Sequence, residues 1–197
     1  MFTGIIREAG RIRSLQSGPG GATMSVEAPA TCASLSLGSS VAVDGVCLTV
    51  TRLAAPVFEV QVVPETLRRT RLGALGPGSI TNLELPLKMG DPLDGHLVQG
   101  HVDGVGVVRE VRPEGIGSWV EIECPPPLRP FFAEKGSVAV NGVSLTIAAS
   151  RPDGFAIALI PTTLQLTNLK DLEKGTRVNL EVDVLARYVL HAREASS

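Results

Sequence analysis

Two ten-residue segments of the chain, 97 positions apart (138 minus 41), carry nearly the same sequence. The first is VAVDGVCLTV at 41–50 and the second is VAVNGVSLTI at 138–147, with seven identical positions. In each, Asp-Gly or Asn-Gly separates two Val-rich runs, which predicts a β-hairpin because a type I′ turn needs positive φ at both central residues. The main chemical change is Cys47 to Ser144. We therefore expect a duplicated hairpin that keeps its geometry and exchanges a thiol for a hydroxyl.

The duplication extends over most of the chain. Gly4 and Gly10 recur as Gly100 and Gly106, and the triplet NLE at 82–84 recurs at 179–181. A period near 97 residues is too long for a solenoid unit and indicates two homologous domains. In the first half we expect a turn at 17–21, short helices at 29–36 and 64–70, and strands at 3–12, 22–27, 58–63 and 79–85 beside the hairpin. This spacing of about six short strands per half is typical of a small closed β-barrel.

The domain limits follow from this repeat. We expect a first barrel at 1–87, a second at 88–183, and a C-terminal helix and tail at 184–197. The tail has no counterpart in the first half, and it places Val184, Leu185, Tyr188 and Val189 along one stripe of a helix. With both barrels closed, a partner subunit is the expected cover for that stripe.

Composition limits the function classes. Hydrophobic residues make up 44% of the 197 residues and aromatic residues only 4%, so the core must be aliphatic. The net charge is −2 with scattered basic residues, which gives no footprint for nucleic acid or membrane. Apolar runs stay well short of the roughly 20 residues of a membrane span, and the N-terminus lacks a signal-peptide pattern. Three widely spaced cysteines indicate free thiols, and a cytoplasmic location is expected.

Strand alternation predicts where the exchanged side chains point. Val46, Leu48 and Val50 share one face and should fill the barrel, so Cys47 and Thr49 should face away from the core. The same alternation exposes Ser144 and Thr146. An ordinary half-buried thiol and a functional thiol at position 47 remain about equally supported by the residues alone.

The segment HLVQGH at 96–101 places two histidines five residues apart. On an extended segment they point to opposite faces, which is wrong for chelating one metal ion, and no zinc-ligand pattern occurs. Each of His96 and His101 is either a core or turn-capping residue or a general acid–base group titrating near neutrality. Asp183 is expected to cap the C-terminal helix, which is compatible with a further role.

Taken together, five motifs make the chain resemble the riboflavin synthase family. They are MFTGII at 1–6, DGVCLTV at 44–50, GHLVQGH at 95–101, NGVSLT at 141–146 and IPTTL at 160–164, in order and over the full length. The resemblance implies an all-β fold of two six-stranded Greek-key barrels in tandem plus a C-terminal α-helix, assembled as a homotrimer. It also names lumazine synthase as a candidate partner.

The resemblance further implies a cofactor-independent transferase. Two molecules of 6,7-dimethyl-8-ribityllumazine react by transfer of a four-carbon unit and give riboflavin and 5-amino-6-(D-ribitylamino)uracil. Each barrel would bind one lumazine, and a working site would join the first barrel of one subunit to the second barrel of its neighbour. The alternative is a non-catalytic lumazine- or flavin-binding protein of the same fold; such proteins tend to lose the catalytic side chains.

The site residues implied by this resemblance form a catalytic and a binding set. The candidate catalytic residues are Cys47, His101, Ser144, His96, Asp183 and Phe2. The candidate binding residues of the first lumazine are Thr3, Gly4, Ile5, Ile6, Ser40, Cys47, Leu48, Thr49, Gln61, Val62, Val63, Pro64, Glu65 and Thr66. Those of the second are Gly100, His101, Val102, Ser144, Leu145, Thr146, Ala158, Leu159, Ile160, Pro161, Thr162 and Thr163, with Lys135 reaching in from a neighbouring subunit. Thr162 stands where the family more often has Glu or His.

Overall fold

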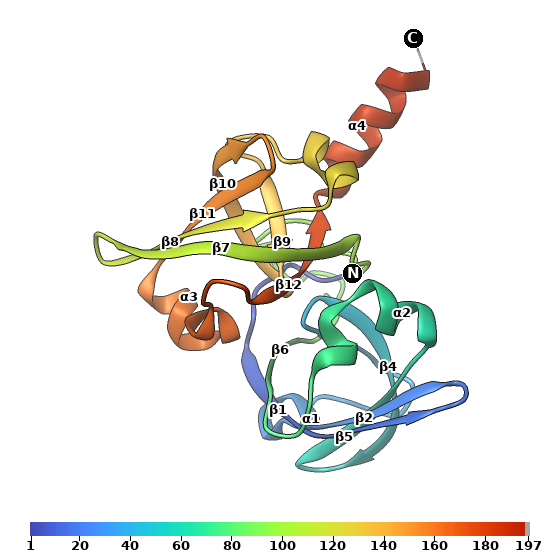
Figure 1. Ribbon diagram of the computed structural model, residues 1–197. Helices are drawn as coiled ribbons and strands as arrows, with labels where there is room; N and C mark the ends of the chain where they lie inside the picture. The colour runs from blue at the N-terminus through green and yellow to red at the C-terminus, as the bar shows by residue number, and fades with distance from the viewer. Residues whose placement is uncertain (196–197) are drawn as a thin grey trace.

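The computed structural model describes residues 1–195; positions 196–197 of the predicted tail lie outside the described residues. Two closed antiparallel barrels lie side by side, the N-terminus lies where they meet, and the C-terminal helix projects away from both (Figure 1). Among the described residues, no helix is long and apolar enough to cross a membrane.

The first barrel has the strand order β1-β2-β5-β4-β3-β6 and closes by pairing β6 with β1. Its strands are β1 (Glu8–Gly18), β2 (Gly21–Glu27), β3 (Ser40–Val43), β4 (Val46–Ala54), β5 (Val57–Val62) and β6 (Ile80–Glu84). Strands β3, β4 and β5 are successive neighbours, and β6 returns to lie beside β3, which is a Greek-key arrangement.

The second barrel repeats this topology strand for strand, in the order β7-β8-β11-β10-β9-β12. Its strands are β7 (Gly104–Glu114), β8 (Gly117–Glu123), β9 (Ser137–Val140), β10 (Val143–Arg151), β11 (Gly154–Leu159) and β12 (Arg177–Val182). The predicted fold class, two six-stranded Greek-key barrels with a C-terminal helix, is confirmed.

Short helices connect the strands at equivalent places in both halves. They are α1 (Pro29–Cys32), α2 (Pro64–Arg69) and η1 (Arg71–Ala74) in the first half, and η2 (Pro126–Phe131), α3 (Pro161–Leu166) and η3 (Asn168–Asp171) in the second. α4 (Val184–Ala195) follows β12. The proline at the first position of α2 and α3 fits a helix start, because its missing N–H would have no intrahelical partner there.

Each barrel has its own aliphatic core, as the low aromatic content predicts. Phe58 is the aromatic residue of the first core, and Phe132 packs on Phe155 in the second with ring centroids 4.5 Å apart. Valine, leucine and isoleucine side chains fill most of both cores. The outer faces of the strands are therefore free to carry polar chemistry.

Two element predictions were wrong at their limits. The strand expected at 3–12 runs instead from Glu8 to Gly18. Residues 3–5 do not pair with a strand of the first barrel, because Thr3 and Gly4 donate to the Glu84 side chain and the Gly4 carbonyl accepts the Ser144 N–H. The helix expected at 29–36 ends at Cys32, after one turn. Both errors lie where tertiary contacts, which local sequence patterns do not report, determine the backbone path.

A buried polar cluster joins the two barrels. Asp44 and Asn141, the first turn residues of the two hairpins, each accept the backbone N–H of an asparagine on the last strand of their own barrel, at 2.8 Å in both cases. Those asparagines, Asn82 and Asn179, reach across and donate to the backbone carbonyls of Asn141 and Asp44 at 2.9 and 2.8 Å. The hairpin turns are thereby fixed against each other by a pseudo-twofold set of hydrogen bonds.

Candidate functional site

Both predicted hairpins are present, and their turns have the expected backbone. Asp44 and Gly45 have φ of 47° and 76°, and Asn141 and Gly142 have 46° and 78°. In β4, Val46, Leu48 and Val50 are buried while Cys47 is half-buried and Thr49 is exposed. β10 shows the same outward placement of Ser144 and Thr146. The prediction from strand alternation is confirmed.

The outer face of each hairpin is covered by a loop that belongs to the other repeat. We call residues 2–5 and 98–101 the crossing loops. They pair antiparallel through Phe2 and Val98 (N–H to O, 2.7 Å) and then diverge. The Gly4 carbonyl accepts the Ser144 N–H of the second barrel at 2.8 Å, and the Gly100 carbonyl accepts the Cys47 N–H of the first at 2.9 Å. Cys47 and Ser144 therefore each face a crossing loop.

Cys47 and His101 line one cavity of about 200 Å³ on the first barrel. The cavity lies between the hairpin, helix α2 and the crossing loop at 98–101. Cys47, Glu65 and Thr66 line it as predicted for the first lumazine. Gly100, His101 and Val102 were predicted at the second lumazine but line this cavity, because their loop crosses to the first barrel. Glu65 forms ion pairs with Arg68 and Arg69, both at 2.5 Å, and these side-chain contacts hold the pKa of Glu65 below its usual range. The structure thus gathers a thiol, an imidazole and a charged rim at one opening.

Ser144 has a different companion. His96 Nδ1 lies 2.7 Å from Ser144 Oγ, and Gly95 and Gly4 pack directly on Ser144, leaving no room for a Cβ at either glycine. Burial lowers the pKa of His96, and the nearby charge of Asp183 partly opposes that shift. The Asp183 side chain also accepts the Leu185 N–H at 2.9 Å, as expected for a cap of α4. The second barrel therefore has its own hydroxyl–imidazole pair.

The environment of His96 favours its neutral form. The residue is buried, and burial lowers its pKa below 6.5 more strongly than Asp183 raises it. Its Nε2 is buried and has no hydrogen-bond partner among the described residues. A neutral imidazole bonded to Ser144 is suited to receive a proton from a bound molecule or through the hydroxyl.

This burial predicts a pH-dependent stability. An unfolded histidine binds a proton below about pH 6.5, whereas His96 in the fold resists protonation, so the free energy of unfolding should fall as pH drops below that value. The slope attributable to His96 is about 1.4 kcal/mol per pH unit until its folded pKa is reached. Urea unfolding of the parent and His96→Gln proteins at about pH 5.5 and 7.5 measures it. The exposed His191→Gln variant is the control, and an unchanged pH dependence in His96→Gln contradicts the assignment.

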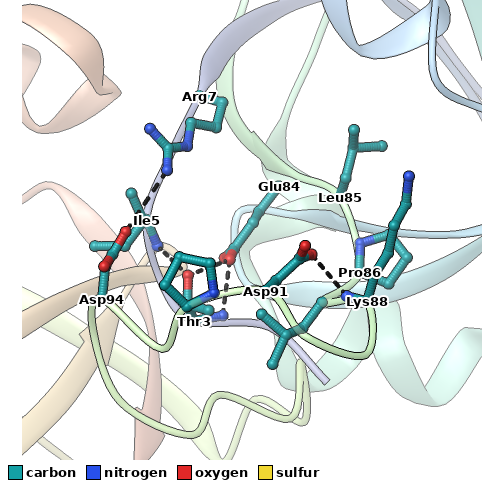
Figure 2. A pocket seen from close by; sticks show the side chains of 11 residues that line it. Thr3, Ile5, Arg7, Glu84, Leu85, Pro86, Lys88, Asp91 and Asp94 are labelled. Carbon is teal, nitrogen blue, oxygen red and sulfur yellow. Dashed lines mark hydrogen bonds and ion pairs between the residues drawn. The ribbon is translucent and has the colours of Figure 1, made fainter.

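Other predicted binding residues line two further cavities. Gln61, Val62 and Val63 border one of about 310 Å³ beside the β1–β2 turn. Thr3 and Ile5 border another of about 340 Å³, closed by Glu84 and the connecting segment 85–94, where Arg7 pairs with Asp94 (Figure 2). Thr3, Gly4 and Ile5 were predicted at the first lumazine, but their crossing loop lies against Ser144 of the second barrel.

The remaining predicted residues fall into buried and outward-facing groups. Phe2 is fully buried and forms a small cluster with Ala42, Val98 and Ala139, on which Cys47 packs. Buried side chains that leave mainly backbone for a ligand are Ile6, Leu48 and Leu159, and Leu145 packs partly on the second core. Outward-facing or half-buried ones are Ser40, Thr49, Pro64, Lys135, Thr146, Ala158, Ile160, Pro161, Thr162 and Thr163.

Four residues at these sites were not among the predicted site residues. Val46, Arg69 and Thr70 line the Cys47 cavity, and Gly95 packs on Ser144. The signal for Arg69 was present: it lies four positions after Glu65 on a short helix, so the two share a face. Gly95 opens the GHLVQGH motif, but nothing in that motif indicates its contact with a strand 49 positions away (144 minus 95).

The two hairpin sites are alike in backbone and unlike in chemistry. Positions equivalent to Cys47, Glu65, Arg69 and His101 in the first site are Ser144, Thr162, Leu166 and Ile5 around the second. One site therefore carries charge and a thiol. The other is less polar and carries the Ser144–His96 pair.

Known proteins are similar to this chain in sequence and architecture. The sequence profile of the lumazine binding domain matches residues 3–86 and again 99–183. Riboflavin synthase of Mycobacterium tuberculosis is 44% identical over 193 residues, covering 96% of both chains, and that of Bacillus subtilis is 36% identical over 189 residues, covering 96% of this chain and 88% of the other. Solved structures of LumP complexed with riboflavin and with 6,7-dimethyl-8-(1′-D-ribityl) lumazine superpose with TM-scores of 0.86 and 0.84 at 29% and 27% identity, covering 92% of this chain and 99% of each LumP chain. The chain belongs to the riboflavin synthase family, whose lumazine-binding domain it contains twice.

Proposed function

We propose that the protein is a riboflavin synthase, a transferase that converts two molecules of 6,7-dimethyl-8-ribityllumazine into riboflavin and 5-amino-6-(D-ribitylamino)uracil. The observation that carries the proposal is the duplicated hairpin site, in which Cys47 and Ser144 occupy equivalent positions beneath crossing loops of opposite repeats. The curated relatives named riboflavin synthase over nearly the full chain support it.

A duplicated site fits a reaction between two identical substrates. Two like pockets bind two like molecules, and their chemical difference makes one molecule the donor and the other the acceptor of the four-carbon unit. The atoms balance without a co-reactant, because the second product is the ring system that has lost those four carbons. Holding both molecules in register supplies roughly 7–11 kcal/mol that a bimolecular encounter lacks.

The side chains have separate roles in this proposal. Cys47 acts at the first-barrel site as nucleophile or hydrogen-bonding group, with His101 at the same cavity assisting proton transfer. Ser144, bonded to the neutral His96, acts at the second. In this proposal Asp183, which caps the start of α4, orients this pair, and the buried Phe2 supports Cys47 as part of the cluster on which Cys47 packs.

The proposed assembly is a homotrimer in the cytoplasm, with functional units 1–87, 88–183 and 184–197. Helix α4 supports the oligomer, because Leu185, Tyr188 and Val189 are 60%, 67% and 67% exposed on the part of the chain that the structure describes. Such an apolar stripe is what a helix-mediated contact between copies would bury. Lys135, exposed on the second barrel, is proposed to reach the site of a neighbour, and lumazine synthase remains a proposed partner.

The direct test is turnover of the lumazine alone. Purified protein is incubated with 6,7-dimethyl-8-ribityllumazine, and absorbance spectra follow both compounds. The proposal requires riboflavin to appear with two lumazines consumed for each one formed. Tight binding without riboflavin formation favours the alternative of a non-catalytic binding protein, to which the LumP structures point.

A conservative change at Cys47 separates chemistry from binding. Cys47→Ser keeps size and hydrogen bonding but removes the thiol, so turnover should fall at least about tenfold while lumazine affinity changes much less. Steady-state kinetics and fluorescence titration measure the two effects. Thr51→Ser, on the same outward face of β4, is the control. Equal losses of turnover and affinity would assign Cys47 a positioning role.

A further inference from the structure

Two buried glutamates occupy equivalent places at the ends of the two barrels. Glu84 closes β6 and Glu181 lies near the end of β12, and they are 7% and 4% exposed. Both belong to the repeated NLE triplet, so the duplication kept them in register. Neither has a basic side-chain partner in the part of the chain that the structure describes; their hydrogen bonds go to loops instead.

Glu84 binds the first crossing loop. Its carboxylate accepts the Thr3 N–H at 2.7 Å, the Thr3 hydroxyl at 2.8 Å and the Gly4 N–H at 2.9 Å, and Figure 2 shows it directed at Thr3 beside the connecting segment. The carbonyl of the same Gly4 accepts the Ser144 N–H. Glu84 of the first barrel thus fixes a loop that lies against the hairpin of the second.

Glu181 does the converse. It accepts the N–H groups of Gln99, Gly100 and His101 at 2.6, 2.9 and 2.8 Å. The Gly100 carbonyl accepts the Cys47 N–H, and His101 lines the Cys47 cavity. Glu181 of the second barrel therefore fixes the loop that closes the site on the first.

We propose that Glu84 and Glu181 are positioning residues with crossed targets: Glu181 sets the geometry of the Cys47 site and Glu84 that of the Ser144 site. This rests on the proposed function for its catalytic meaning, but the crossed geometry itself does not. Each half-site is then completed only when the opposite barrel is folded. The two barrels therefore depend on each other for the geometry of their sites.

The chemistry of a carboxylate explains the choice. Three convergent donors need an acceptor without hydrogens, and an ionised carboxylate accepts at both oxygens. A glutamine would present an NH₂ group to one of the N–H donors, which displaces the loop. Burial raises the pKa of both glutamates, because removing the carboxylate charge from water is unfavourable. A neutral glutamine avoids this cost of burying a charge but disrupts the hydrogen bonds to the loop. Glutamine variants should therefore fold and yet lose local geometry.

Cys47 supplies a probe that needs no substrate. It is the half-buried thiol beneath the crossing loop at 98–101, whereas Cys32 and Cys124 are buried. In the parent, Glu181→Gln and Glu84→Gln proteins, the labelling rate of Cys47 by an aromatic disulfide reagent is followed by absorbance, with the surface variant Glu173→Gln as the control. We expect Glu181→Gln to raise the rate about tenfold or more and Glu84→Gln to leave it within about twofold of the parent.

Turnover of 6,7-dimethyl-8-ribityllumazine should fall in both glutamine variants. Equal labelling rates in the two variants, or no increase in Glu181→Gln, overturn the crossed assignment. If Cys32 and Cys124 also react, the variant has unfolded. Glu181→Asp and Glu84→Asp then replace the two glutamine variants, because their shorter carboxylates reach the loops poorly but remain hydrogen-bond acceptors. The same difference in Cys47 labelling rate between the two variants is required. Labelling of Cys47 needs no lumazine, so the roles of Glu84 and Glu181 can be tested even in a protein that does not turn over. If only Glu181→Gln raises the labelling rate and no variant forms riboflavin, the crossed assignment holds and only the proposed function is discarded.

Discussion

Replacing Arg71 by leucine should lower the free energy of unfolding by about 3 kcal/mol. Its guanidinium lies 3.2 Å from the Asp44 carboxylate, which is fully buried, and its own side chain is 16% exposed. Burial raises the pKa of Asp44, and Arg71 acts against that rise. Removing one partner of a buried ion pair leaves an uncompensated charge, at a cost of about 3–5 kcal/mol, and the partial exposure of Arg71 places the loss at the lower end. Urea unfolding at pH 7 measures it.

The second repeat supplies the matched control. Its equivalents of Asp44 and Arg71 are Asn141 and Asn168, a neutral pair in the same buried cluster. Asp44→Asn combined with Arg71→Asn therefore copies a solution that the chain already uses, and the double variant should be more stable than Arg71→Leu. With the single variants Asp44→Asn and Arg71→Asn, the double variant completes a double-mutant cycle that gives the coupling free energy between the two side chains. Purely additive losses would contradict the view that the charge of Asp44 requires Arg71.

Gly100→Ala should reduce riboflavin formation by about 10²-fold or more. Gly100 has a φ of +80°, which an alanine rarely adopts, and an added Cβ would lie 2.6 Å from Cys47 Cβ and 2.9 Å from its backbone N. The crossing loop must then move away from the hairpin, carrying His101 with it. Displacements of about 1 Å are enough for losses of this size when reacting groups are held in register.

A glycine in open surroundings separates this effect from a general loss of backbone freedom. Gly76 has no atom within 4 Å of an added Cβ and has no positive φ, so Gly76→Ala should retain turnover. Thermal unfolding of both variants shows whether the barrels persist. Parent-like turnover in Gly100→Ala would show that the loop is not needed at the Cys47 site.

Much of the fold could be predicted because the same sequence pattern occurs in both halves of the chain. The Asp-Gly and Asn-Gly turns determine the hairpins locally, and strict alternation about Cys47 determines which face enters the core. The aliphatic cores follow from composition. The path of residues 2–5 could not be predicted this way, because their long-range hydrogen bonds go to Glu84, His96, Val98 and Ser144, 80 or more positions along the chain.

The candidate site shows the same division. His96 and Ser144 were each singled out, but their contact depends on how the connecting segment lies against β10. Glu84 and Glu181 looked like ordinary strand residues at sequence level, because a buried carboxylate at a strand end is recognised only by the N–H groups that it faces. The placement of Thr162 at the second site and the reach of Lys135 stay predictions.

We also propose, as the resemblance to riboflavin synthases implies, that a working site joins the Cys47 half of one copy to the Ser144 half of another. Within one chain, Cys47 and Ser144 bond through their N–H groups to different crossing loops. Gly4→Ala is the counterpart of Gly100→Ala: Gly4 has a φ of +77°, and an added Cβ would lie 2.6 Å from Ser144 Cβ. One variant damages the second-barrel half-site and the other damages the first.

The most direct measurement is riboflavin formation by the two variants after they are unfolded and refolded together. Each variant refolded alone should be nearly inactive. In mixed oligomers of equal parts, an intact first half and an intact second half meet at about a quarter of the sites, so the mixture should recover up to about a quarter of the parent activity. One variant is labelled with ¹⁵N so that native mass spectrometry can identify mixed oligomers. A mixture that stays as inactive as the separate variants, although mixed oligomers have formed, would contradict a site shared between copies.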